Sequence, residues 1–236
     1  MSHTAPENDV MTTETVMPPE RTAEAESGGG VVLHQLVRHY GCVVADPPWQ
    51  YAEGWPAWND NGERKPLDYS QMTLDEIKAL PVGKLLKHEG YLFLWTTNRY
   101  LEEGFKVCRA WTCVPRQTLT WCKPQRGKGP GGMFATTTEF VIVAQRIGEN
   151  SNARGARTNG DRVDTSWFEW PRYKHSEKPE AFQDMVERVC PGPYLEIFAR
   201  RKRLGWHAWG NEVPCDVVMP NDQALPEAGR NQATTL

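Results

Sequence analysis

The sequence predicts an α/β domain in which a mostly parallel sheet has helices on both faces. Short apolar runs of strand length alternate along the chain with segments whose apolar residues recur at helical spacing. At 236 residues the chain is also long enough to bury one substantial core. We place this domain at residues 31–212. Residues 1–30 form an acidic tail that we expect to be disordered, and residues 213–236 form a loose polar tail.

The first half of the domain contains two predicted strands and two predicted helices. Cys42–Ala45 and Tyr91–Trp95 are continuous apolar runs, which predicts strands buried on both faces. Thr73 and Glu76 have the spacing of a capping box, so a helix should begin there and end near Leu80. A second helix is expected over about 99–111, because apolar residues recur there at helical spacing.

The second half contains three predicted strands and one predicted helix. The strands are Gln117–Trp121, Phe140–Ala144 and Tyr194–Phe198. The helix is marked by apolar residues at helical spacing from Phe182 to Val189, with Pro179 in its first turn. This alternation of strands and helices predicts a mainly parallel sheet with helices on both faces.

The charge distribution indicates an anion-binding surface that the formal net charge of −3 conceals. Residues 114–210 hold 16 Lys or Arg against 10 Asp or Glu. Segments 50–70, 122–138 and 146–176 lack periodicity, and they mix aromatic with basic residues in a way that suits a polyanion with unstacked bases. These residues are Trp55, Trp58, Tyr69, Lys123, Arg126, Lys128, Phe134, Arg154, Arg157, Arg162, Arg172 and Lys174. The alternative is solvated loop charge with a few anchoring rings.

Cysteine spacing and hydropathy give no sign of a metal site, a signal peptide or a membrane span. The six cysteines form no C-x-x-C pair, and no histidine pair has zinc spacing, so we expect no metal and reduced thiols. No apolar stretch approaches the length of about 20 residues that crosses a bilayer. We therefore expect a soluble, intracellular protein.

The strongest local motif is Asp46-Pro47-Pro48-Trp49, directly after the first predicted strand. Two prolines stop the strand and fix the backbone, so the carboxylate is held at the strand's carboxyl end, where open α/β sheets bind ligands. An acid, a rigid carbonyl and a ring suit an exocyclic amino group: Asp46 and the Pro47 carbonyl accept its two N–H bonds while Trp49 stacks on the base. The alternative is a strand-end turn with a capping acid.

Residues 127–132 also match G-x-G-x-x-G, but we reject this as a dinucleotide fingerprint. That fingerprint requires a helix that begins inside it, and Pro130 is followed by no helical periodicity. The glycines predict a flexible loop instead.

Six sequence blocks, in this order, resemble the MT-A70 family of adenine-N(6) methyltransferases over about residues 41–212. They are Asp46–Trp49, Tyr91–Asn98, Trp121–Lys123, His175–Glu180, Glu196–Arg200 and Trp209–Glu212. The resemblance implies a Rossmann-like methyltransferase fold with three αβα layers. In this fold's circularly permuted order, the catalytic motif precedes the cofactor-binding strand.

The resemblance also implies S-adenosylmethionine as the cofactor and assigns residues to it. Asp46 would lie near the methionine amino group and Lys178 near the methionine carboxylate, while further residues would line the ribose and adenine. These further residues are Phe198, Arg200, Asn211 and Glu212. Tyr69 matches an aromatic residue in the loop that covers the target base. Some relatives carry an acid upstream that helps to hold the cofactor's adenine, but this chain has none between Glu26 and Asp46.

The sequence leaves several points open. We expect DNA rather than RNA as the substrate, because the chain resembles a bacterial or phage stand-alone member. The same resemblance implies a location in the cytoplasm of a bacterium or of a phage-infected host cell. Methylation of a protein glutamine is disfavoured, since enzymes of that type carry Asn at the position of Asp46. A non-catalytic nucleic-acid-binding subunit is disfavoured by the intact motif and by Lys178. The oligomeric state stays open between a monomer and a homodimer.

Overall fold

The computed structural model describes most of the domain, and its element bounds can be compared with the predicted ones. The described residues are 40–51, 57–58, 64–65, 71–124, 133–147, 159–171 and 177–219. The helices are α1 (Leu74–Ala79), α2 (Val82–Leu85), α3 (Leu101–Ala110) and α4 (Glu180–Val189), and a short 3₁₀ turn, η2 (Asn98–Tyr100), precedes α3. The strands are β1 (Tyr40–Ala45), β2 (Ala57–Trp58), β3 (Arg64–Lys65), β4 (Leu86–Thr96), β5 (Cys113–Cys122), β6 (Thr138–Arg146), β7 (Trp167–Glu169), β8 (Tyr194–Ile197) and β9 (Trp206–Trp209).

Seven strands form one sheet in the order β7-β5-β6-β4-β1-β8-β9, and β2 pairs with β3 separately. Only β6 runs against its neighbours in the seven-stranded sheet, because it is antiparallel to both β4 and β5, whereas the other pairs are parallel. The carboxyl ends of β1, β4, β5 and β8 therefore lie at one edge of the sheet, together with the amino end of β6. We call this the carboxyl edge.

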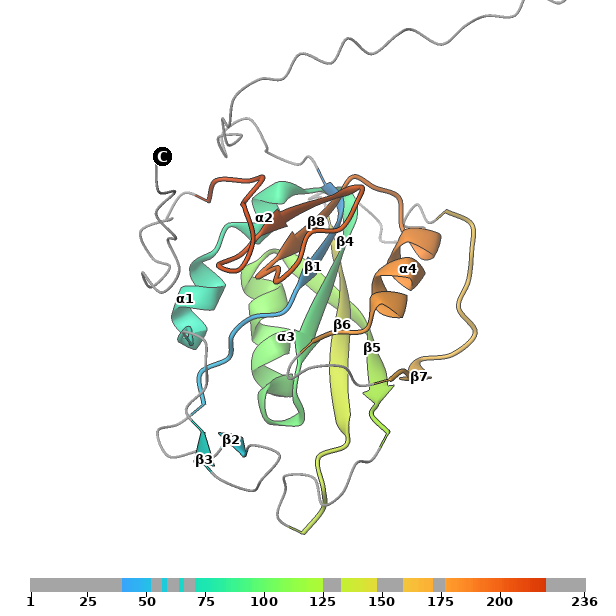
Figure 1. The fold of residues 1–236 in the computed structure, drawn as a ribbon. Coiled ribbons are helices and arrows are strands. Elements are labelled where there is room, and N and C mark those ends of the chain that lie inside the picture. Colours follow the sequence, from blue (N-terminus) through green and yellow to red (C-terminus); the bar gives the residue numbers. More distant parts are fainter. Residues whose placement is uncertain are drawn as a thin grey trace, which may run out of the picture.

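Helices cover both faces of the sheet, which confirms the predicted α/β class with three layers (Figure 1). Along β1, Val43 and Ala45 pack in the cluster that contains apolar side chains of α1, α2 and α3. Cys42 and Val44 point the opposite way, into the cluster that contains the apolar stripe of α4. This alternation follows from the strand period of two, and it explains why a continuous apolar run forms a strand covered on both sides.

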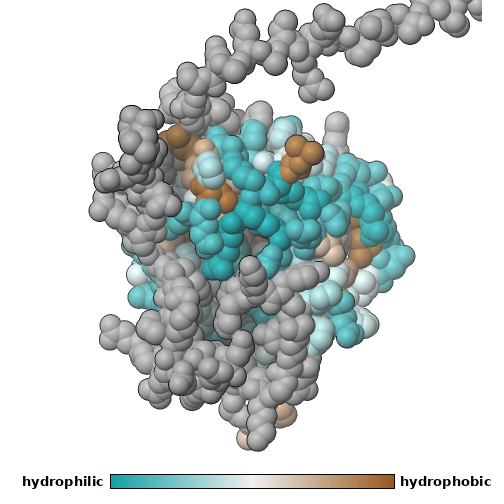
Figure 2. Space-filling view, viewed as in Figure 1, coloured by the Kyte–Doolittle hydropathy of each residue, from teal (hydrophilic) through white to brown (hydrophobic). Residues whose placement is uncertain are grey.

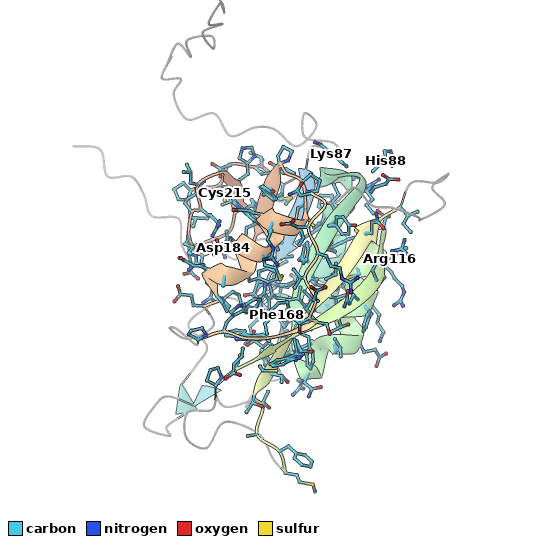
Figure 3. The ribbon with its side chains drawn as sticks, turned by 90° about the vertical axis from the view of Figure 1, so that its right-hand side faces the viewer. Lys87, His88, Arg116, Phe168, Asp184 and Cys215 are labelled. Carbon is cyan, nitrogen blue, oxygen red and sulfur yellow. The ribbon has the colours of Figure 1, made fainter. Side chains whose placement is uncertain are left out.

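The α4 side of the sheet faces the viewer in Figure 3, where Asp184 marks this helix and Phe168 marks β7. Lys87 and His88, near the start of β4, lie at the upper end of the molecule in that view. The carboxyl edge is at the opposite, lower end.

The capping box predicted at Thr73 is confirmed: its side chain accepts the Glu76 N–H, and the Glu76 carboxylate accepts the Thr73 N–H at 2.7 Å. The predicted strands and helices all exist, with bounds that differ by a few residues. The sequence interpretation missed β9, the four-residue helix α2 and the short strands β2, β3 and β7. These three short strands fall in segments without apolar periodicity.

The folded domain continues past the predicted boundary at residue 212. Val217 and Met219 are buried in the main core cluster. Asp216 accepts the backbone N–H of Ala208 at 2.8 Å, which attaches this segment to β9. The sequence analysis did not predict that Val217 and Met219 are buried, because residues 213–236 are mostly polar.

Candidate active site

The Asp46 motif leaves the sheet at the carboxyl edge, between two parallel neighbours. β1 pairs with β4 on one side and with β8 on the other, and the Asp46 N–H donates to the Ile197 carbonyl at 3.5 Å. Asp46 thus lies at the carboxyl end of a central parallel strand, as the sequence predicted.

Backbone hydrogen bonds fix the residues that follow. The Trp49 N–H donates to the Pro47 carbonyl, and the Met72 N–H donates to the Pro48 carbonyl, both at 2.9 Å. Trp49 and Met72 also form an isolated parallel bridge. The Pro47 oxygen keeps one of its two lone pairs for another donor, because a carbonyl oxygen accepts two hydrogen bonds.

Trp49 is buried in the structure. Its ring stacks on Tyr100 with centroids 5.3 Å apart, and its indole N–H donates to the Trp95 carbonyl at 3.3 Å. Trp49 therefore anchors the motif to β4 and to η2. Its contact with a base stays a prediction, and its low exposure (5%) leaves little ring surface for such a contact.

A chain of alternating charges crosses the carboxyl edge at Asp46. Lys178, just before α4, places its Nζ 2.8 Å from Asp46 Oδ2 and 3.3 Å from Glu139 Oε2. The other Glu139 oxygen bonds to Lys123 at the end of β5. Because β6 is antiparallel, its second residue, Glu139, reaches the same edge as the ends of β1 and β5. The topology thus brings together four residues that are far apart in sequence.

Burial and charge compete at these groups. Burial alone would lower the pKa of Lys178, but the carboxylates of Asp46 and Glu139 outweigh it and raise that pKa above its usual value. Burial alone would raise the pKa of Glu139, but Lys178 and Lys123 lower it below its usual value. Lys178 also lies over the Trp95 ring, 5.2 Å from the centroid. The charged forms of Lys178 and Glu139 are therefore favoured.

A second partly buried carboxyl group, Glu196 on β8, lies close enough to Asp46 for their charges to interact. Burial and the negative charge of Asp46 raise the pKa of Glu196 to about 7. Gln183, buried on α4, donates to Glu196 Oε2 at 2.8 Å, and Arg201 donates to the Gln183 amide oxygen at 3.4 Å. Arg201 is fixed in turn by Glu177, at 2.9 Å. The sequence interpretation did not single out Glu139, Glu196 or Gln183, although an acid between apolar residues of a strand is a usable signal.

The residues assigned to the ribose and adenine of the cofactor follow β8 and β9 at the same edge. Phe198 has a positive φ of 64°, which is strained for a residue with a side chain, and its ring meets the Trp209 ring edge-on at 5.6 Å. Arg200 pairs with Glu212 at 3.3 Å, while Asn211 and Glu212 are exposed. The structure thus brings these four residues to two adjacent loops, and their contacts with a cofactor stay predictions.

The predicted nucleic-acid contacts are only partly described. Tyr69, Arg126 and Lys128 lie outside the described residues. Lys123 is described, and its ammonium group is engaged by Glu139 and lies over the Trp121 ring. The basic run at 200–203 is also paired with carboxylates. The pairs are Arg200–Glu212, Arg201–Glu177, Lys202–Asp216 and Arg203–Asp184. The four cations at 200–203 therefore form ion pairs within the protein.

All six cysteines are described and free, and four of them are buried. Within the described part of the chain, no group of three or more His, Cys, Asp or Glu side chains is arranged to hold a metal ion. No helix among the described residues is both long and apolar enough to span a membrane.

Comparison with known proteins decides the family. The MT-A70 family model matches residues 40–212, which is most of the chain. The chain belongs to the MT-A70 family. The seven-stranded, mostly parallel sheet agrees with the Rossmann-like methyltransferase fold that this family implies, and β1 with its Asp46 motif precedes β8 in the chain.

Relatives with named activities include bacterial and eukaryotic methyltransferases. The type II methyltransferase M.MunI of a Mycoplasma species is 28% identical over 198 residues, which cover 78% of this chain and 82% of that protein. The human N(6)-adenosine-methyltransferase catalytic subunit METTL3 is 27% identical over 187 residues, or 75% of this chain and 29% of METTL3. The human N(6)-adenine-specific methyltransferase METTL4 is 25% identical over 191 residues, or 74% of this chain and 37% of METTL4. The chain thus spans well under half of these two human relatives.

Proposed function

We propose that this MT-A70 protein transfers a methyl group from S-adenosylmethionine to the N6 amino group of adenine in DNA. The observation that carries the proposal is the pairing of Asp46 with Lys178 at the carboxyl end of β1, beside a Pro47 carbonyl fixed by its own turn. Lys178 occupies Oδ2 of Asp46. We assign Oδ1 and the Pro47 oxygen to the two N–H bonds of the adenine amino group.

These two acceptors address the chemical difficulty of the reaction. The lone pair of an aromatic amino nitrogen is delocalised into the ring, so the nitrogen is a poor nucleophile. Two fixed acceptors orient the N–H bonds and favour a tetrahedral nitrogen, whose lone pair points at the methyl donor. As the N–C bond forms, the bond between the methyl carbon and the sulfonium sulfur would break and leave a neutral thioether. The nitrogen would then carry the positive charge until it releases one proton. Asp46 is the nearest carboxylate placed to accept that proton.

The charge of the site fits the proposed cofactor. When bound, S-adenosylmethionine supplies an activated methyl group on a positively charged sulfonium. Beside Asp46, the carboxylates of Asp46 and Glu139 alternate with the ammonium groups of Lys178 and Lys123. The carboxylates suit a sulfonium and an amino group, and Lys178 supplies the cation for the methionine carboxylate. On the other flank, we assign Phe198, Arg200, Asn211 and Glu212 to the ribose and adenine.

Similarity supports DNA as the substrate. The chain aligns with 82% of the type II methyltransferase M.MunI but with only 29% of the adenosine methyltransferase METTL3. RNA is the second candidate substrate. METTL3 is an N(6)-adenosine-methyltransferase by name, and its 27% identity to this chain is close to the 28% of M.MunI.

A label-transfer assay tests the proposal. Purified protein should transfer the labelled methyl group of S-adenosylmethionine to adenine in DNA. Asp46→Ala should abolish transfer, whereas the matched control Asp75→Ala, an exposed acid on α1, should retain it. Label found on RNA alone would overturn the DNA assignment. A failure to bind S-adenosylmethionine in calorimetry would overturn the enzyme assignment.

A further inference from the structure

Two adjacent large apolar side chains stand exposed on the segment that leads into β6. Met133 is 91% exposed and Phe134 is 81% exposed. A single exposed apolar residue is common and needs no explanation, whereas two neighbouring large ones on a projecting segment indicate a contact surface.

Backbone contacts locate this pair at the carboxyl edge. Cys122 pairs with Thr138, and the Lys123 N–H donates to the Thr137 carbonyl at 2.7 Å, so the β5–β6 ladder continues past the ends of both strands. Residues 133–136 lie beyond that last hydrogen bond. In Figure 1 the chain before β6 extends past the end of the sheet, and in Figure 2 hydrophobic atoms appear at the same lower tip.

The pair is within reach of the proposed pocket. Phe134 is five residues from Glu139 in the sequence, a separation of at most about 18 Å even for an extended chain. Glu139 contacts Lys178, which contacts Asp46. Leu204, which is 99% exposed, lies instead just before β9, at the amino end of the parallel strands. Met133 and Phe134 therefore share an edge with the site, and Leu204 does not.

Size and charge indicate what the pair contacts. An aromatic side chain buries about 150–250 Å², so two side chains supply far less than the roughly 800 Å² per partner of a stable protein interface. Lys123 is engaged by Glu139, but the sequence from 124 to 138 adds two further cations, Arg126 and Lys128, and no carboxylate. Apolar side chains beside this positive sequence charge suit the bases and phosphates of a nucleic acid.

We propose that Met133 and Phe134 form a wedge that enters the base stack of duplex DNA while the target adenine occupies the pocket beside Asp46. This inference rests on the proposed function. A base inside a duplex cannot reach the Asp46 carboxylate unless it is rotated out of the stack, and this rotation costs stacking and pairing energy. Apolar side chains that fill the vacated space recover part of the lost stacking. The proposal therefore names duplex DNA as the substrate. Met133 and Phe134 should contribute to methylation of duplex DNA but not of single-stranded DNA.

The test compares native and heat-denatured plasmid DNA as acceptors in the label-transfer assay. Met133→Ala/Phe134→Ala should lower the initial rate on native DNA about tenfold or more, because the flipped state loses its stabilisation. The rate on denatured DNA should stay close to that of the unsubstituted protein. Phe134→Leu keeps an apolar wedge and should retain most of the native-DNA rate. Leu204→Ala, the matched exposed apolar control, should leave both rates unchanged.

Other results would overturn the wedge. Equal losses on native and denatured DNA would assign the pair to general binding, and no loss on either would remove its role. A change in sedimentation behaviour of the double variant would show that the pair is a contact between copies of the chain. Unsubstituted protein that labels only denatured DNA or RNA would overturn the wedge but leave methyl transfer standing. Protein that labels no nucleic acid would overturn the proposed function and the wedge together.

Discussion

Replacing Glu196 with glutamine should stabilise the protein progressively as the pH rises above 4.5, with the full effect above about pH 7. Glu196 is a partly buried carboxyl group on β8, and this burial together with the Asp46 charge raises its pKa to about 7 from the ordinary value of 4.5. In the folded protein it is therefore protonated over a range of pH in which it is ionised in the unfolded chain. Gln183 already donates to Glu196 Oε2, and an amide oxygen at that position accepts the same hydrogen bond.

The magnitude follows from proton linkage. Because the folded pKa is higher than the unfolded pKa, the folded state binds more protons, and stability is lost as pH rises through the interval between them. The folded and unfolded pKa values differ by about 2.5. At about 1.4 kcal/mol for each pH unit, the loss of folding stability is about 3 kcal/mol. This loss begins near pH 4.5, the unfolded value, and is complete above pH 7. The glutamine in Glu196→Gln cannot ionise, so this variant does not lose stability in this way.

The assay is urea denaturation of both proteins at several pH values from 4 to 9, in steps of about one unit. Other titrating groups are shared and largely cancel in the difference between the two free energies of unfolding. We expect that difference to rise by about 3 kcal/mol in favour of Glu196→Gln between pH 4.5 and pH 8. A difference that stays constant across this range would refute the assigned environment of Glu196, and a change of the opposite sign would show that the positive charges of Arg201 and Lys178 outweigh burial and Asp46 there.

Three further predictions concern the fold and the charge cluster. Thr73→Ala should cost about 1 kcal/mol in urea denaturation, because the capping box of α1 is lost; an unchanged midpoint would contradict this. Gly210→Ala should cost about 1–3 kcal/mol in the same measurement, because its Cβ would lie 2.2 Å from a backbone carbonyl oxygen; wild-type stability would show that the loop after β9 is looser than described. Glu139→Gln removes one of the two carboxylates on Lys178 and should lower methyl transfer about tenfold in the label assay. The exposed control Glu169→Gln should leave the rate unchanged, and equal rates for both variants would contradict a role for Glu139.

Elements with strong local signals were predictable. Cys42–Ala45 reads as a buried strand because its residues are apolar on both faces, and Thr73 reads as a helix start because capping depends on a spacing of three residues. β7 and β9 carry no such signal: Trp167–Glu169 is three residues long, and Trp206–Trp209 includes the exposed, polar His207. Their pairing partners, β5 and β8, place them in the sheet.

The candidate site shows the same division. Asp46 and Lys178 were predicted from motifs, but nothing in the sequence placed Glu139 against Lys178. That contact depends on β6 being antiparallel, so that its amino end reaches the carboxyl edge. Glu196 was hidden for a related reason, because its environment is made by Gln183 on a helix that packs against the sheet. Long-range topology, rather than local pattern, decides which charges meet.

The central claim is that Asp46 accepts an N–H of the adenine amino group, and Asp46→Asn tests it most directly. The substitution preserves size, but Lys178 lies 2.8 Å from Oδ2 and will attract the amide oxygen, which turns the amide NH₂ toward the substrate in place of an acceptor. We predict a loss of methyl transfer to DNA of about a hundredfold or more, with S-adenosylmethionine binding in calorimetry retained. A variant that methylates adenine at the rate of the unsubstituted protein would contradict the account.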